Sequence, residues 1–138
     1  LERHRLADLF LDTRIYGAHT TASDALWAGL PVLTCMGETF PARVAASLLQ
    51  AMEIPELITH SLEEYEEQAV QLATRPADLT LLRDKLTYNR LRTSLFDTER
   101  FVRHLERAYE LVWDRHVRGL SPAPLHVPAL PAVNRGSA

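Results

Sequence analysis

The residue types best suited to chemistry lie close together in Gly17-Ala18-His19-Thr20-Thr21, with Asp24 one helical turn further on. Two threonine hydroxyls, an imidazole and the free backbone N–H groups at the start of a helix are all hydrogen-bond donors. Such donors bind phosphate groups. A carboxylate one turn later can accept hydrogen bonds from ribose hydroxyls. The segment therefore predicts a diphosphate site in which Asp24 contacts a ribose.

The same residues also fit a purely structural role. Thr21-x-x-Asp24 has the spacing of a helix-capping box, and His19 would then be a surface residue of the preceding loop. The segment also lacks the repeated glycines of a nucleotide-binding fingerprint. Spacing alone leaves both interpretations open.

The elements around this segment predict a βαβ unit. Leu6 to Asp12 is mostly apolar without alternation, which is typical of a strand covered on both faces. Gly17 lets the following loop turn, Thr21 caps a short helix that ends at Gly29, and Val32 to Thr34 forms the next strand. In such a unit the loop after the first strand is where α/β folds hold phosphates.

The pattern then repeats, so the predicted fold is α/β and Rossmann-like, with a parallel sheet and right-handed crossovers. A turn at Gly37-Glu38-Thr39 leads into a second helix, and Glu56 to Ile58 is a weaker third strand. Beyond Ser61 only helices are predicted, the first of them opened by the capping box Ser61-x-x-Glu64.

The longest predicted helix runs from Thr98 to Arg118 and would extend about 30 Å. We therefore expect one domain over residues 1–118, with long carboxyl-terminal helices. From Gly119 onward proline, glycine and small residues dominate, which predicts a loose tail over residues 119–138.

Composition excludes several classes of function. A net charge of -3 offers nothing to attract nucleic acid or an anionic membrane, and no apolar run is long enough for a membrane span. The six histidines show no metal-ligand spacing, so no metal site is expected. The single cysteine, Cys35, fits a cytoplasmic location. Because the chain starts without methionine directly before a strand, we expect a segment of a longer protein.

Three ungapped blocks carry a family resemblance. They are Leu6-Ala7-Asp8-x-x-Leu11-Asp12-Thr13, then Gly17-Ala18-His19-Thr20-Thr21-x-x-Asp24-x-Leu26-Trp27-Ala28-Gly29-x-Pro31-Val32-x-Thr34, then Gly37-Glu38-Thr39-x-x-x-Arg43-Val44-Ala45-Ala46-Ser47-x-Leu49. In these blocks the chain resembles the carboxyl-terminal catalytic region of O-linked N-acetylglucosamine transferases, and weaker similarity continues to Trp113.

The resemblance implies the nucleotide-sugar-binding half of a GT-B glycosyltransferase, in which two Rossmann-like halves face one another. It also implies contacts from six residues to a UDP-sugar: Arg3 to the nucleobase, Asp24 to the ribose, His19, Thr20 and Thr21 to the diphosphate, and Tyr16 to the sugar.

Two of these residues bear on which sugar is used. Tyr16 is larger than the residue at the matching position of the animal enzymes. Whether the N-acetyl group of the donor sugar fits beside it is therefore an open question. The related plant-type O-fucosyltransferases carry threonine where His19 stands. His19 therefore favours a UDP-sugar over GDP-fucose.

The implied reaction is transfer of N-acetylglucosamine from UDP-GlcNAc to a serine or threonine hydroxyl of a protein, with inversion and without a metal or other cofactor. No catalytic residue is identifiable in the chain, because the family places its general base in the other half. The implied partners are that amino-terminal half and upstream TPR repeats. We therefore expect these 138 residues alone to be inactive.

Two other functions remain open at this point. The chain could be a non-catalytic scaffold that holds partners through its longest helix. It could also belong to a transferase of another sugar, with GDP-fucose or UDP-glucose as donor.

Overall fold

The computed structural model of the chain describes residues 1–130. These residues form two compact units, one up to Phe96 and one from Asp97 on. The elements in chain order are η1 (Glu2–Leu6), β1 (Phe10–Leu11), α1 (Thr20–Ala28), β2 (Val32–Cys35), η2 (Phe40–Ala42), α2 (Val44–Ala51), η3 (Pro55–Leu57), β3 (Ile58–Thr59), α3 (Leu62–Thr74), α4 (Pro76–Asn89) and α5 (Thr98–Val117), where η marks a 3-10 helix.

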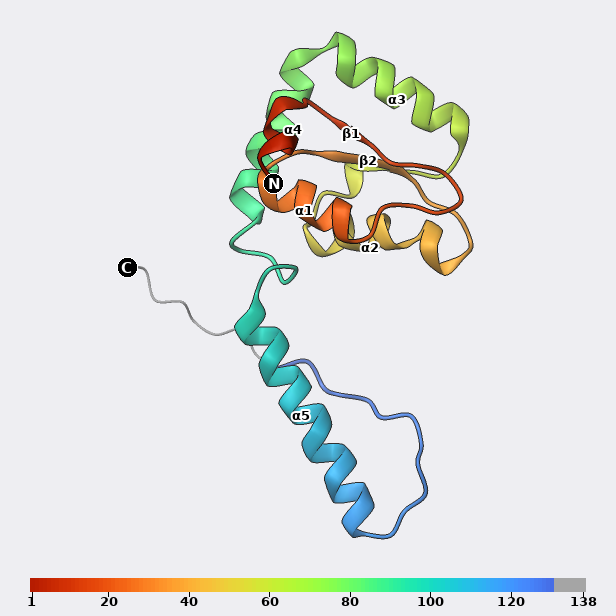
Figure 1. The fold of residues 1–138 in the computed structure, drawn as a ribbon, viewed down its shortest axis with the longest axis vertical. Coiled ribbons are helices and arrows are strands. Elements are labelled where there is room, and N and C mark those ends of the chain that lie inside the picture. Colours follow the sequence, from red (N-terminus) through yellow and green to blue (C-terminus); the bar gives the residue numbers. More distant parts are fainter. Residues whose placement is uncertain (131–138) are drawn as a thin grey trace, which may run out of the picture. The chain divides into compact units, whose positions relative to one another are not determined.

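The first unit is a parallel sheet covered by helices, which confirms the predicted α/β class. β2 lies between β1 and β3, with Phe10 in register with Val32 and Thr34 in register with Ile58. α1 and α2 lie on one side of the sheet and α3 on the other (Figure 1). Because all three strands are parallel, their carboxyl ends meet at one edge of the sheet.

The core lies between the sheet and these helices. Leu33 of β2, Leu26 of α1, Leu49 of α2 and Leu86 of α4 are fully buried in one cluster. Each buried leucine side chain contributes about 2 kcal/mol to stability. Leu26 lies on the same buried face of α1 as two fully buried alanines, so α1 packs closely against the sheet.

The carboxyl end of α1 is held by the segment around the end of α4. The Arg90 guanidinium donates a hydrogen bond of 2.7 Å to the Trp27 carbonyl oxygen and lies 5.5 Å from the centre of the Trp27 ring. The Phe96 ring meets the same indole nearly edge-on, with 5.0 Å between centroids. These contacts and the buried alanines fix α1 along its length.

The first strand differs from its prediction. Only Phe10–Leu11 is extended and paired, whereas Leu6 belongs to η1 and is 90% exposed. Leu11 is 54% exposed, so the expected burial on both faces is wrong. The reason is that β1 is an edge strand among the described residues and pairs with β2 alone.

The other boundaries shift by only a few residues. β3 forms at Ile58–Thr59, one or two residues later than predicted, because Pro55–Leu57 turns as a 3-10 helix. The Ser61 capping box is confirmed, since the Ser61 hydroxyl accepts a 3.1 Å hydrogen bond from the Glu64 backbone N–H.

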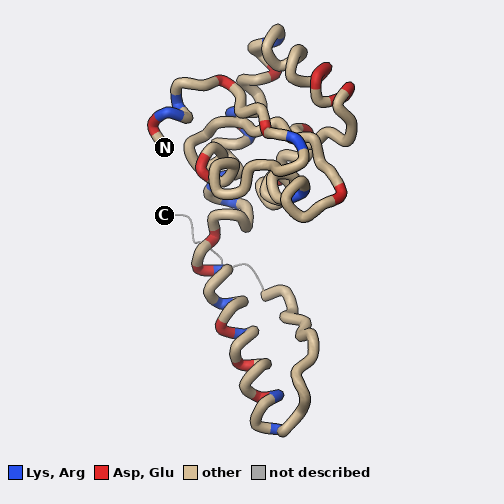
Figure 2. Tube along the Cα trace, turned by 45° about the vertical axis from the view of Figure 1, so that its right-hand side comes forward, with Lys and Arg blue, Asp and Glu red and all other residues tan. Residues whose placement is uncertain are grey.

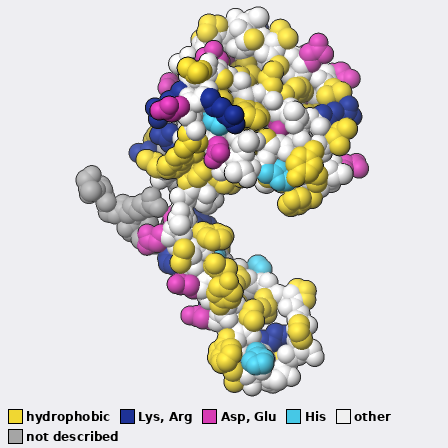
Figure 3. Space-filling model, in the orientation of Figure 1, with side chains coloured by type: hydrophobic (Ala, Val, Ile, Leu, Met, Phe, Trp, Pro, Cys, Tyr) yellow, Lys and Arg dark blue, Asp and Glu magenta, His cyan; other side chains and the backbone are white. Residues whose placement is uncertain are grey.

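The second unit is built on α5, whose predicted length is confirmed. The Asp97 carboxylate accepts a 3.0 Å hydrogen bond from the Arg100 backbone N–H and so caps the helix. Acidic and basic residues alternate along α5 (Figure 2). Hydrophobic side chains also gather along it (Figure 3), and these exposed side chains are Phe101, Val102, Leu105, Tyr109, Val112, Trp113 and Val117.

The residues after α5 return alongside the helix. Residues 119–130 form no helix or strand, but the Leu130 backbone N–H donates a 3.1 Å hydrogen bond to His104 Nε2. The rest of the predicted tail, residues 131–138, lies outside the described residues.

Candidate functional site

The loop that follows β1 is organised by the buried carboxylate of Asp12, which is 8% exposed. Asp12 Oδ1 accepts hydrogen bonds from the backbone N–H groups of Thr13 at 2.9 Å and Ala18 at 2.7 Å. Asp12 Oδ2 accepts a bond of 2.7 Å from the Thr34 hydroxyl at the end of β2. One side chain therefore closes the loop on itself and joins it to the neighbouring strand.

Gly17 is required in this loop for its lack of a side chain. Its N–H donates a 3.1 Å hydrogen bond to the Pro41 carbonyl oxygen, and a Cβ there would lie 2.9 Å from Asp12 Oδ2. The left-handed residue of the loop is Ile15, with a φ of 75°. The expectation that Gly17 supplies the turn is thus corrected: Gly17 allows the close approach of Asp12 and Pro41.

The helix begins two residues earlier than predicted. α1 starts at Thr20, His19 is its N-cap, and no side chain caps it. The capping box of Thr21 and Asp24 is therefore wrong. Asp12 holds the Ala18 N–H, so the chain enters the helix directly afterwards, and Thr21 already lies within the first turn.

The absence of a cap leaves hydrogen-bonding groups free at the amino end of α1. Thr20, Thr21 and Asp24 are exposed, and within residues 1–130 their side chains have no hydrogen-bond partner. The first backbone N–H groups of a helix also have no partner inside the helix. Two hydroxyls, several N–H groups and the positive end of the helix dipole are therefore open to an anion.

His19 stands beside these groups, between two aromatic rings. The Tyr16 ring stacks on the imidazole with a centroid separation of 5.2 Å and an interplanar angle of 14°. The Phe40 ring meets it edge-on at 5.9 Å and 88°. His19 Nε2 is buried and has no hydrogen-bond partner among the described residues.

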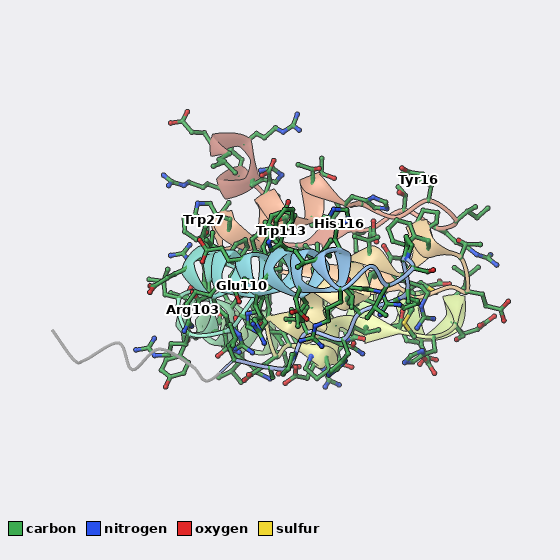
Figure 4. The ribbon with its side chains drawn as sticks, turned by 90° about the horizontal axis from the view of Figure 1, so that it is seen from below. Tyr16, Trp27, Arg103, Glu110, Trp113 and His116 are labelled. Carbon is green, nitrogen blue, oxygen red and sulfur yellow. The ribbon has the colours of Figure 1, made fainter. Side chains whose placement is uncertain are left out.

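Arg3, the remaining predicted site residue, lies apart from this group. It is exposed on η1, before β1, whereas the other five residues follow β1. η1 lies near the carboxyl end of α1, where Arg5 and Trp27 line one pocket. Figure 4 shows Trp27 and Tyr16 far apart within the first unit. The structure thus brings five of the predicted residues together and leaves Arg3 at the other end of α1.

Tyr65 of α3 supports the loop from the other side of the sheet. Its hydroxyl donates a 2.8 Å hydrogen bond to the Asp12 carbonyl oxygen. Burial raises the pKa of the Tyr65 phenol above its usual value, and negative charge on Asp12 and Cys35 raises that pKa further. The phenol therefore remains a hydrogen-bond donor at any physiological pH.

Replacing Tyr65 with phenylalanine is expected to lower the free energy of unfolding by about 1 kcal/mol at pH 7, because one hydrogen bond is lost. The pKa of Tyr65 is higher in the folded protein than in the unfolded chain. The stabilising effect of the phenol is therefore complete below about pH 10 and is lost as the pH rises through the folded-state pKa. Urea unfolding of both proteins between pH 7 and 11 measures this. If the difference in the free energy of unfolding between Tyr65→Phe and the unaltered protein grows above pH 10, the phenol is not the hydrogen-bond donor.

Comparison with known proteins identifies the family. Residues 1–105 match the family model of glycosyl transferase family 41. The chain belongs to glycosyl transferase family 41. The resemblance inferred from the three ungapped blocks is thereby confirmed.

Relatives in family 41 include two similar proteins named as UDP-N-acetylglucosamine–peptide N-acetylglucosaminyltransferases. The probable enzyme SEC of Arabidopsis thaliana is 45% identical over 123 residues, which cover 88% of this chain and 13% of the relative. The Caenorhabditis elegans protein is 36% identical over 120 residues, covering 87% of this chain and 10% of the relative. The chain thus spans a small part of these proteins.

A solved structure in the same family has the same fold. A mutant O-GlcNAc transferase of Thermobaculum terrenum superposes with a TM-score of 0.76 and 32% sequence identity, over 86% of this chain and 23% of that chain. The parallel sheet and its helices are therefore those of a family 41 transferase.

Two residues of this family 41 site were missed by sequence reasoning. The sequence places Asp12 in the first strand and in the first block of the resemblance but predicts no site role for it, although an acidic residue at the end of an apolar run, followed by a loop with glycine, is a signal for such an anchor. Phe40 had no signal at all, because its contact with His19 joins loops from different βα units.

Within residues 1–130, no three histidine, cysteine, aspartate or glutamate side chains gather closely enough to hold a metal ion. None of the described helices combines the length and the apolar character needed to cross a membrane.

Proposed function

We propose that this chain is the donor-binding part of a protein O-glycosyltransferase that transfers N-acetylglucosamine from UDP-GlcNAc to serine or threonine hydroxyls with inversion. The observation that carries the proposal is the cluster of exposed, unpartnered donors at the start of α1. The names of the relatives support UDP-GlcNAc as donor and a peptide as acceptor.

The chemistry of the cluster suits a leaving diphosphate. When the acceptor oxygen attacks C1 of the sugar, the bond from C1 to the phosphate oxygen breaks and its electron pair leaves with UDP. Negative charge then develops on the diphosphate, where donors from His19, Thr20 and Thr21 stabilise the transition state more than the ground state. Under this proposal the oriented donors replace a metal ion.

The remaining predicted site residues contact the other parts of the UDP-sugar. Asp24, one turn along α1, accepts hydrogen bonds from the ribose, and Tyr16 faces the sugar. Arg3 contacts the nucleobase. The acceptor proton goes to a general base outside this chain, in an amino-terminal half preceded by TPR repeats. We also propose a cytoplasmic location, which the single cysteine fits.

Replacing Thr21 with alanine is expected to weaken UDP binding about tenfold, because a charge-assisted hydrogen bond to the diphosphate is lost. The measurement is isothermal titration calorimetry with UDP on the protein that carries this chain. Thr87→Ala is the matched control, since Thr87 is an exposed threonine on α4 without a hydrogen-bond partner for its side chain among the described residues. Equal UDP affinity of Thr21→Ala and the unaltered protein would contradict the proposal.

A turnover assay separates the transferase from the scaffold and sugar alternatives. We expect UDP release from UDP-GlcNAc in the presence of acceptor protein, and much slower release of nucleotide from UDP-glucose or GDP-fucose. A scaffold would give no turnover with any of the three donors. Faster turnover with another donor would replace the sugar assignment and leave the diphosphate site intact.

A further inference from the structure

We propose that Phe40 is a positioning residue for the donor site, which acts by holding the His19 imidazole against Tyr16. This inference rests on the proposed function, because it gives the held imidazole a ligand, the diphosphate of a nucleotide. Phe40 belongs to the second βα unit, whereas His19 lies in the loop of the first βα unit.

Within residues 1–130, no hydrogen bond fixes the orientation of the imidazole. His19 Nε2 is buried and without a partner among the described residues, so the ring could swing about its side-chain bonds if nothing else held it. The stacked Tyr16 ring restricts it on one face. The Phe40 ring, nearly perpendicular to the imidazole at 88° with 5.9 Å between centroids, restricts the remaining rotation. Stacked and edge-on geometries are the favoured arrangements of aromatic pairs.

The backbone gives these rings fixed places. The Thr13 hydroxyl donates a 2.9 Å hydrogen bond to the Tyr16 carbonyl oxygen. The Gly17 N–H donates to the Pro41 carbonyl oxygen, which ties the first loop to the turn that bears Phe40. Phe40 is therefore held close to the His19 loop through its neighbour Pro41.

Packing within the core does not account for Phe40. Its side chain is 77% exposed, and it lies outside the buried cluster that forms the core. An exposed phenylalanine whose ring contact is with a site histidine has a small part in stability and a direct part in the geometry of that histidine. Its replacement should leave the protein folded.

The test is UDP calorimetry on the protein that carries this chain, with five variants. Phe40→Ala is expected to weaken UDP binding by about threefold to tenfold, the range that one aromatic pair contributes. Phe40→Tyr, which keeps the ring, should restore the affinity. Phe101→Ala is the matched control, because Phe101 is 65% exposed on α5 and should leave the affinity unchanged.

The last two variants, His19→Ala alone and Phe40→Ala combined with His19→Ala, test whether Phe40 acts through His19. If it does, losing Phe40 should have little further effect once the imidazole is absent, which is the outcome of a coupled pair. The imidazole NMR signals of His19, assigned by their loss in His19→Ala, should also shift in Phe40→Ala and return in Phe40→Tyr.

The outcomes distinguish this inference from the proposed function. Weaker binding in His19→Ala but not in Phe40→Ala, with unchanged His19 signals, overturns the positioning role and leaves the proposed function in place. An equal loss from Phe40→Ala with and without His19 also overturns it. If the unaltered protein does not bind UDP, the proposed function fails and the inference fails with it.

Discussion

Asp12→Ala is expected to lower the free energy of unfolding by about 3 kcal/mol and to remove measurable UDP binding. The change leaves the Thr34 hydroxyl and the Ala18 N–H without their acceptor. An unpaired polar group in a buried place costs about 1–3 kcal/mol. Without the carboxylate, the Ala18 N–H directly before α1 loses its anchor, so the exposed donors should no longer converge. Urea unfolding and UDP calorimetry measure the two effects.

Two further variants make the Asp12 prediction specific. Asp84→Ala removes an exposed carboxylate on α4 and should change stability by less than about 0.5 kcal/mol. Asp12→Asn keeps one acceptor oxygen and should lie between the unaltered protein and Asp12→Ala in both measurements. If Asp12→Ala is as stable as Asp84→Ala, the carboxylate does not organise the loop.

Gly17→Ala is expected to cost about 2 kcal/mol of stability and to weaken UDP binding along with it. The new Cβ would lie 2.9 Å from Asp12 Oδ2 and 3.1 Å from the Pro41 carbonyl oxygen. The carboxylate cannot move aside easily because three hydrogen bonds hold it. The loop must therefore shift, and His19 shifts with it.

Gly119→Ala is the control that separates crowding from backbone strain. Gly119 has a φ of 66°, but none of the described residues has an atom within 4 Å of an added Cβ, so only strain of about 1 kcal/mol is expected there. That change lies in the second unit and should not alter UDP affinity. Equal UDP affinities of Gly17→Ala and the unaltered protein would show that the contact with Asp12 does not shape the site.

Much of the secondary structure could be predicted because its signals are local. The apolar spacing of α5, the capping serine of α3 and the glycine that ends α1 each act through residues within a turn or two. The predicted burial of the first strand is wrong because burial depends on non-local contacts. Continuous apolarity reports the residue types and not the number of neighbouring strands, and Leu11 lies on an edge strand.

The candidate site also has a part that the sequence predicts and a part that only the tertiary structure shows. By itself, the sequence determined the family, the α/β class and the cluster of donors from His19 to Asp24. Only the tertiary structure decided which atoms hold that cluster in place: the Asp12 carboxylate joined to Thr34, 22 residues away, and the Phe40 ring set against His19. The physical reason is that parallel pairing of β1 with β2 brings the carboxyl ends of distant segments together at one edge of the sheet, and contacts made there have no local periodicity in the chain.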